Sequence, residues 1–174
     1  METISNAAES TAVISLGEAM QLAEDLFGLE AIKSECKTLV GYDNKNFYLK
    51  GSQRINNNEL LPVQEFVFKV INGLESQEQG VAEAAVDMTS FLSAKGVNCP
   101  TAAPSVNGQY TEWIYLPFHR NDDEPVGLQT RHAVQMYHYL PGTVFCNIER
   151  PFSVDIFYDV GRFVGNIGFS LKVS

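Results

Sequence analysis

The sequence predicts an α+β fold with a mostly antiparallel sheet. Three observations support this prediction: segments with a period of two are interleaved with segments at helical spacing, turn-forming residues separate them, and in two places one strand follows another without a helix between them. The length of 174 residues and the composition, 45% hydrophobic and 19% charged, fit one compact globular domain.

The first third of the chain predicts a tail, a helix and a hairpin. Residues 1–15 are expected to be disordered, and a short amphipathic helix follows, with apolar residues at helical spacing: Leu16, Met20, Ala23, Leu26 and Phe27. Residues 32–40 and 47–50 predict strands, joined by a turn at 41–46 that contains Gly, Asp and Asn. The polar segment 51–62 predicts a loop.

A central strand and a helix are predicted next. Residues 65–71 are rich in aromatic and β-branched residues, which favours a strand. Its period of two places Phe66, Phe68 and Val70 on one face and Val67, Lys69 and Ile71 on the other. Residues 76–94 predict a helix that ends before Gly96. Its predicted buried stripe comprises Val81, Ala84, Ala85, Met88, Phe91 and Leu92.

The last third predicts two strands, a linker and an apolar helix. Residues 110–118 and 133–139 are the strands, with a polar turn at 121–125, and Leu-Pro-Gly at 140–142 predicts a linker. Residues 151–168 return to helical spacing, with an apolar stripe of Ile156, Val160, Phe163, Val164 and Ile167. A stripe so apolar requires a partner, so we expect the chain to have been cut from something larger.

The bulk composition excludes several classes of protein. With a net charge of -9 and twelve scattered Lys and Arg residues, a nucleic-acid partner is not expected. No segment approaches the ~20 apolar residues that cross a bilayer, and the N-terminus does not resemble a secretory signal, so we expect no membrane partner and a cytoplasmic location. Cys36, Cys99 and Cys146 are widely spaced, which predicts reduced, packed thiols.

Lys69 is the residue that first indicates a function. An unpaired charge in the middle of a buried strand costs several kcal/mol, so the ammonium group requires an anion. The alternative is an edge strand with Lys69 in solvent, and the strand by itself does not decide between the two. A lone histidine gives no metal site, and His132 is expected to be a strand-edge residue.

The order of the predicted elements resembles the N-terminal lobe of a protein kinase. In that lobe a hairpin turn covers the phosphates, a strand lysine contacts them, a helix acid positions the lysine, and the last strand leads into the adenine-binding hinge. Phe66-Val67-Phe68-Lys69 stands where protein kinases have V-A-I-K. The resemblance implies a kinase-like lobe at 16–139, followed at 140–174 by the hinge and the first helix of a missing C-terminal lobe.

Four sequence blocks resemble the hydroxylysine kinases of the aminoglycoside phosphotransferase family. Gly41-Tyr-Asp-Asn-Lys-Asn-Phe-Tyr48 resembles their S-Y-D-D-[RK]-N-F loop, and residues 83–96 resemble their E-x8-F-L-x-x-x-G helix. Met136-Tyr-His-Tyr-Leu-Pro-Gly142 resembles the L-L-x-Y-L-P-G hinge, and Tyr158-Asp-Val-Gly-Arg162 resembles Y-E-I-G-K. The blocks occur in the same order and extend over most of the chain, from about residue 38 to 167.

The resemblance implies a set of nucleotide-binding residues: Gly41, Asp43, Asn44, Asn46, Val67, Lys69, Glu83, His138 and Leu140. The turn would contact the phosphates mainly through backbone amides, Val67 would lie against the base, and the hinge residues would contribute backbone groups. Glu83 is preferred to Glu78 or Asp87 only by its register with the family helix. By helical period it lies about 200° past Val81, which favours a solvated acid.

Residues that would perform phosphoryl transfer are not found. The segment His119-Arg120-Asn121-Asp122 resembles a kinase H-R-D triplet, but Asn121 replaces the acid and the segment precedes the hinge. None of the three histidines begins an H-x-D-x4-N loop, so no catalytic residue and no metal ligand is predicted in this chain. The segment 168–174 also departs from the family pattern, and we interpret the chain as truncated.

The implied cofactor is GTP or ATP with Mg2+, whose ligands are expected in the missing lobe. The full-length form would transfer the terminal phosphate of GTP to the hydroxyl of 5-hydroxy-L-lysine, a small amino-acid substrate, whereas this chain is not expected to turn over alone. One alternative is a non-catalytic fragment that binds nucleotide or pairs with another protein through its 156–167 face. Another is an unstable by-product without a role.

Overall fold

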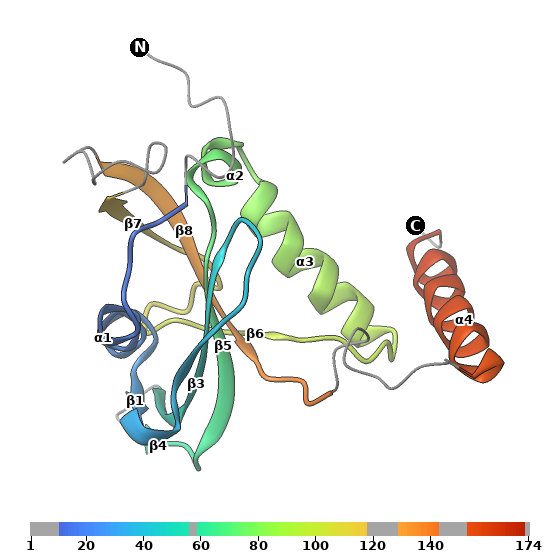
Figure 1. Ribbon diagram of the computed structural model, residues 1–174, viewed down its shortest axis with the longest axis horizontal. Helices are drawn as coiled ribbons and strands as arrows, with labels where there is room; N and C mark the ends of the chain where they lie inside the picture. Colours follow the sequence, from blue (N-terminus) through green and yellow to red (C-terminus); the bar gives the residue numbers. More distant parts are fainter. Residues whose placement is uncertain (1–10, 56–58, 118–128, 143–152, 173–174) are drawn as a thin grey trace.

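The computed structural model describes residues 11–55, 59–117, 129–142 and 153–172. Within them, eight strands form one antiparallel sheet with β3, β5 and β8 at its centre, which confirms the α+β prediction (Figure 1). The strands are β1 (Leu29–Ala31), β2 (Lys37–Leu39), β3 (Lys45–Ile55), β4 (Glu59–Leu60), β5 (Gln64–Val70), β6 (Ala102–Ala103), β7 (Glu112–Pro117) and β8 (Gln129–His138). The helices are α1 (Leu16–Phe27), the 3-10 helix η2 (Lys33–Glu35), α2 (Gly73–Gln77), α3 (Val81–Ala94) and α4 (Val154–Leu171).

The predicted first helix is confirmed as α1. Ser15 caps its N-terminus in a capping box with Glu18, and Gly28 ends it with a φ of 66°. A side chain on Gly28 would bring a Cβ within 2.8 Å of the Arg54 carbonyl oxygen, so only glycine fits this end. The helix lies beside the sheet and buries Ala19, Ala23 and Phe27 against it.

The core lies between α1 and one face of the sheet. Phe66, Phe68 and Val70 of β5 are completely buried there, as the period of two predicts. Phe68 meets Phe27 of α1 edge to face, with ring centroids 5.9 Å apart. Burial of each of these large side chains contributes roughly 1.5–3 kcal/mol. β5 is therefore held firmly by the side chains on its α1 side.

Several predicted boundaries are wrong near the N-terminus. Part of the predicted disordered tail packs on β7, because Ala12 is buried and the Val13 amide donates to the Pro117 carbonyl at 2.9 Å. η2 interrupts the strand predicted at 32–40, and β3 continues to Ile55 through half of the predicted loop. β3 can continue through these polar residues because their side chains find partners. The buried side-chain amide of Gln53 donates to Phe27 O at 3.1 Å and to Pro104 O at 2.9 Å.

The apolar stripe predicted on the second helix is wrong for most of its residues and confirmed for Leu92. The helix is broken at residues 78–80 into α2 and α3, and Val81 and Met88 are 46% and 48% exposed. The residues of α3 that are buried are Ala82, Val86 and Leu92. Ala82 packs against Ala133 of β8, where only a small side chain allows close contact. Its carbonyl accepts a 2.7 Å hydrogen bond from the Gln135 side chain.

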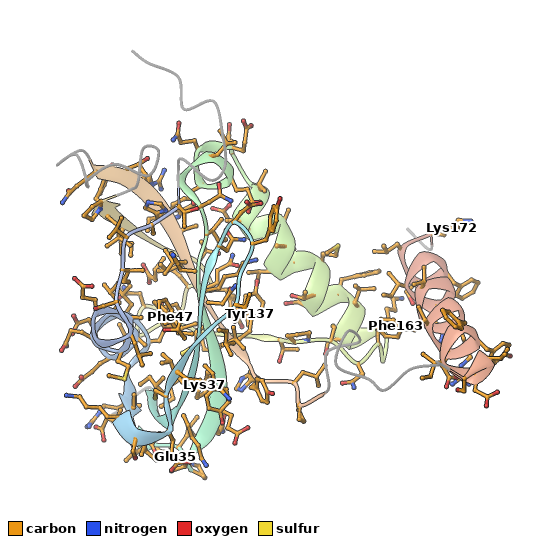
Figure 2. All side chains as sticks on the ribbon, viewed as in Figure 1. Glu35, Lys37, Phe47, Tyr137, Phe163 and Lys172 are labelled. Carbon is orange, nitrogen blue, oxygen red and sulfur yellow. The ribbon has the colours of Figure 1, made fainter. Side chains whose placement is uncertain are left out.

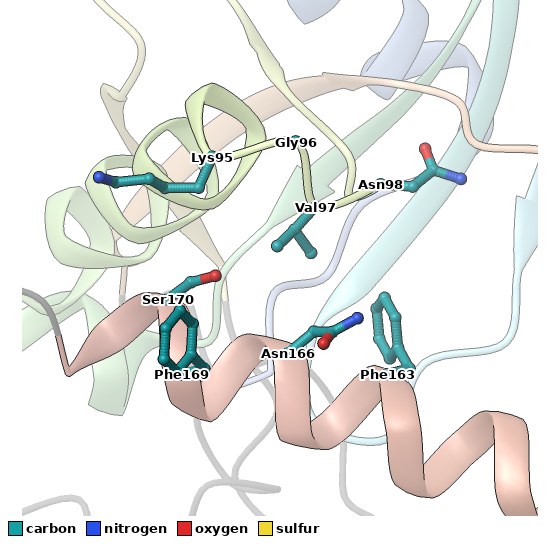
Figure 3. Close-up of a pocket in the computed structure, with 8 residues that line it drawn as sticks. All are labelled: Lys95, Gly96, Val97, Asn98, Phe163, Asn166, Phe169 and Ser170. Carbon is teal, nitrogen blue, oxygen red and sulfur yellow. The ribbon is translucent and has the colours of Figure 1, made fainter.

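The helix predicted at 151–168 is confirmed as α4, but none of its described residues is buried. It faces the segment 95–98 across a cavity of about 620 Å³, lined on its side by Phe163, Asn166, Phe169 and Ser170 (Figure 3). In its predicted apolar stripe, Val164 remains 61% exposed. The apolar stripe of α4 is therefore left uncovered by the described residues, as expected of a helix that lacks its packing partner. Among the described residues, no helix combines the length and apolar character that crossing a bilayer requires.

Two of the three cysteines lie in the described part of the chain. Cys36 and Cys99 are free, half-buried thiols, as predicted, whereas Cys146 lies outside the described residues. The turn predicted at 121–125 and the His119 segment also lie outside them. β6 is a further strand that was not predicted, because two residues are too few to show an alternating pattern.

His132 is not the strand-edge residue that was predicted. It is completely buried in β8, opposite Ile114 of β7, and its Nδ1 lies 2.8 Å from the Ile71 carbonyl oxygen. Because a carbonyl only accepts, Nδ1 carries the proton in the neutral ring. Nε2 has no hydrogen-bond partner in the part of the chain that the structure describes. Burial lowers the pKa of His132, since a charged ring would lose its hydration there.

The buried His132 predicts a loss of stability in acid. The unfolded chain takes up a proton below pH ~6.5 while the folded chain resists it, so the free energy of unfolding falls as pH falls through that value. In a His132→Gln variant the free energy of unfolding should fall less over the same pH range, even if the variant is less stable at every pH. Urea unfolding at pH 7.5 and pH 5.5 measures the difference, and equal pH dependence in both proteins would contradict the assignment.

Candidate functional site

Lys69 lies in the interior of the sheet and not at its edge. β5 pairs with β3 on one side and β8 on the other, in a register that places Asn46, Lys69 and Gln135 side by side. This row is on the face opposite the α1 core, because Phe47 and Phe68 point the other way; Phe47 and Tyr137 mark the two faces in Figure 2. The edge-strand alternative is therefore excluded.

The ammonium group of Lys69 has no described partner. Its side chain is half-buried, and among the described residues no ion pair or side-chain hydrogen bond involves it. Gln135, its neighbour in the row, is fully engaged, since its amide donates to Ala82 O at 2.7 Å and Thr111 Oγ1 at 2.9 Å. A lysine in a half-buried position, without a counterion among the described residues, is suited to bind an anionic ligand.

The turn before β3 lies at the same end of β5. Lys45 and Asn46, the first residues of β3, pair with Val70 and Lys69, so residues 41–44 extend just beyond that point. In the described part of the chain, the backbone amides of 41–44 donate no hydrogen bond. Unbonded amides in a tight turn form a concave site for anions such as phosphates. The turn and Lys69 therefore offer two kinds of donor in one region.

Gly41 is required by the closeness of this turn. A Cβ at this position would overlap the Asn44 carbonyl oxygen and come within 2.6 Å of Asn46 Nδ2. Asn46 Nδ2 itself donates to that carbonyl at 3.4 Å, and the Asp43 carbonyl accepts from Thr11 Oγ1 at 3.2 Å. The turn is thus closed on itself and attached to the N-terminal segment, which limits its freedom.

Asn44 has a different environment from that expected of a phosphate ligand. Its Oδ1 accepts hydrogen bonds from the Asn72 backbone amide at 2.7 Å and from Asn72 Nδ2 at 3.2 Å. Asn72 is buried and caps α2 by accepting from the Glu75 amide at 2.9 Å. The oxygen of Asn44 is therefore directed into the protein, towards the junction of β5 and α2.

Aromatic residues that the sequence interpretation omitted surround Val67. In register, Val67 lies between Tyr48 of β3 and Tyr137 of β8, and Tyr139 meets Tyr48 edge to face at 5.1 Å. Burial raises the pKa of Tyr48 and of Tyr137 to about 12, so both phenols stay protonated at neutral pH. Tyr48 is two residues from Asn46, and Tyr137 is two residues from Gln135. Residues two apart on a strand share a face, so this spacing could have identified both tyrosines.

The hinge residues are partly committed to the sheet. The amide of His138 donates to Thr101 O at 2.9 Å, and that of Tyr139 donates to Glu65 O at 2.8 Å. The His138 ring packs against Phe66, and burial lowers its pKa. Leu140 is 40% exposed, and its backbone has no hydrogen bond to another described residue. Leu140 therefore retains backbone groups that a ligand could use.

Glu83 follows Ala82, whose carbonyl accepts from Gln135 in the row that contains Lys69. It is exposed on the flank of α3 and lines a cavity of about 340 Å³ with Asp87 and residues 109–113. No ion pair joins it to Lys69 within the described ranges, so its role as the partner of Lys69 stays a prediction. No cluster of His, Cys, Asp or Glu among the described residues could hold a metal ion.

The sheet, α3 and the following crossover are consistent with a kinase-like N-terminal lobe, which is the class of protein that the fold indicates. Two curated relatives are hydroxylysine kinases. The chain is 29% identical over 160 residues to that of Danio rerio and 27% identical over 154 residues to that of Xenopus laevis. These matches include 91% and 88% of this chain but only 39% and 37% of the relatives. No family model matches the chain.

Both relatives are named as kinases, and a kinase in general requires a nucleotide and Mg2+. The turn amides and the Lys69 ammonium group, which have no partner among the described residues, fit the phosphates of such a nucleotide. The described residues do not offer a ligand set for the metal ion.

The tight turn predicts a specific effect at Gly41. Gly41→Ala should lower the free energy of unfolding by about 1–3 kcal/mol, because the added methyl group must displace the Asn44 backbone. Gly142→Ala is the matched control, since an added Cβ there meets no atom within 4 Å. Urea unfolding of both variants measures the difference. Equal stability of the two would show that the turn yields easily and is not closed as described.

Proposed function

We propose that this chain is a nucleotide-binding lobe, in which Lys69 and the 41–44 turn hold the phosphates of a purine nucleoside triphosphate. The observation that carries the proposal is Lys69, a half-buried residue whose ammonium group has no counterion among the described residues, beside a turn whose amides are unbonded there. Both groups attract phosphate oxygens, and partial burial strengthens that attraction. The net charge of -9 repels a triphosphate as it repels other anions, so the attraction has to come from these local groups.

The nucleobase would lie on the face formed by Tyr48, Val67 and Tyr137. Aromatic rings and a branched aliphatic side chain offer a flat apolar surface, and the backbone of Leu140 would supply hydrogen bonds at the hinge. Backbone contacts of this kind accept either GTP or ATP. GTP is the donor that the resemblance to hydroxylysine kinases suggests.

The complete reaction that we infer is transfer of the terminal phosphate to the hydroxyl of 5-hydroxy-L-lysine. It is supported by the name of the two relatives, of whose length this chain spans 37–39%. An aspartate that accepts the hydroxyl proton and side chains that hold Mg2+ would complete the site. Because the sequence has no H-x-D-x4-N motif, we propose that the residues described contribute binding rather than proton transfer.

Substitution of the strand lysine tests the proposal. Lys69→Ala should weaken binding of GTP and ATP roughly tenfold to hundredfold, the effect of removing a charged hydrogen-bond donor worth about 1.5–3 kcal/mol. Lys33→Ala makes the same charge change on exposed η2 and should leave affinity unchanged. Isothermal titration calorimetry in Mg2+ measures both. Equal affinity of wild type and Lys69→Ala would reject the role of Lys69.

A second candidate function, a protein-interaction fragment, is favoured by α4. None of the described residues of this helix is buried, although its stripe is apolar. Contiguous exposed apolar faces tend to associate with other surfaces. Association and nucleotide binding are compatible, because α4 contributes no residue to the candidate site.

The exposed helix predicts concentration-dependent association of the chain. Val164→Asp should reduce it at least severalfold, because burial of an added carboxylate in an apolar contact is costly. Gln79→Glu, between α2 and α3, adds the same charge at an exposed site and should have little effect. Sedimentation velocity over a hundredfold concentration range measures association. A monomer throughout that range would reject this candidate.

A further inference from the structure

Asn44 connects the 41–44 turn to the segment that carries Lys69. Its Oδ1 accepts two hydrogen bonds from Asn72, one from the backbone amide and one from the side chain. Asn72 follows Lys69 by three residues, about 10 Å along an extended chain. The same segment therefore supplies the cation of the candidate site and the point of attachment of the turn.

The attachment is rigid at its far end. Asn72 is 1% exposed, and its side chain caps α2 by accepting from the Glu75 amide. The neighbouring Ile71 amide donates to Ala133 O at 2.9 Å, which joins the junction to β8. Asn44 thus holds the turn against a buried, fully packed junction and not against a surface loop.

We propose that Asn44 is a positioning residue: its side-chain oxygen fixes the turn so that the unbonded amides of residues 41–44 stay beside Lys69. The proposal rests on the proposed triphosphate site and adds the group that arranges it. The turn has only two other described side-chain attachments, at Asp43 O and within the turn at Asn44 O. Without the Asn72 contacts, the phosphates would have to order the turn on binding, which weakens affinity.

A direct role of Asn44 as a phosphate ligand is the competing interpretation, and its amide nitrogen is the group that would act in that case. The two roles differ in what a carboxylate does at this position. The Asn44→Asp variant would keep an oxygen that accepts from Asn72, so it preserves positioning. It would lose the nitrogen donor and add a negative charge, so it would be the worst replacement for a ligand.

The test compares Asn44→Ala and Asn44→Asp with the wild-type chain. Affinities for GTP and guanosine, and for ATP and adenosine, are measured by calorimetry, and protection of the Asn72 amide is measured by hydrogen exchange. Asn44→Ala should lower triphosphate affinity roughly tenfold, leave nucleoside affinity within twofold, and expose the Asn72 amide to exchange. Asn44→Asp should retain that protection and bind triphosphate more tightly than Asn44→Ala. A general loss of structure would lower both affinities together.

Three results overturn the inference. Equal triphosphate affinity of Asn44→Ala and wild type would show that the attachment does not position the turn, while leaving the proposed function intact. Weaker triphosphate binding by Asn44→Asp than by Asn44→Ala, with the Asn72 amide protected, would show that Asn44 is a direct ligand. Absence of triphosphate binding by the wild-type chain would overturn the proposed function and this inference with it.

Discussion

Lys69 is held inside the sheet by the pairing of β5 on both of its edges. Hydrogen bonds to β3 and β8 prevent the strand from rotating, and the burial of Phe66, Phe68 and Val70 determines which face is apolar. Because successive side chains alternate, the ammonium group must lie on the opposite face. A shift of one residue would expose three buried side chains, so the position of the cation is set by the core.

The neighbouring elements are arranged around this constraint. β3 brings the 41–44 turn to the end of β5, and β8 brings Gln135, which ties the first turn of α3 to the sheet. The turn is closed by its own contacts and by Asn72, yet its amides remain unbonded among the described residues. A site of this kind is organised before any ligand binds, so little ordering entropy opposes binding.

The elements predicted correctly are those with strong local signals. β5 follows from a run of aromatic and β-branched residues, and α1 from apolar residues at helical spacing. The length of β3 was not predictable, because polar residues such as Gln53 are satisfied by partners far along the chain. The buried face of α3 was assigned correctly only at Leu92, since the packing of Ala82 and Val86 depends on segments distant in the sequence.

The candidate site shows the same division. Lys69 is predicted from its place in a strand of apolar residues and Gly41 from the resemblance of its loop, whereas Tyr48 and Tyr137 are not predicted, because only strand pairing places them beside Val67. Asn44 was predicted as a nucleotide-binding residue, but its oxygen contacts Asn72, a residue 28 positions away. Glu83 remains a prediction from register alone. The contacts of these side chains depend on which distant segments pair, and local sequence patterns do not specify that pairing.

The sequence by itself determined the fold class, the presence of a charged residue in a strand of apolar ones, and the resemblance to a kinase lobe. Period, composition and motif order are local properties, so they can be read without coordinates. Only the tertiary structure decided that this strand is internal, that the turn meets its end, and that α4 remains uncovered. These facts depend on which distant segments pair and pack, and burial and hydrogen bonding across the whole chain select that arrangement.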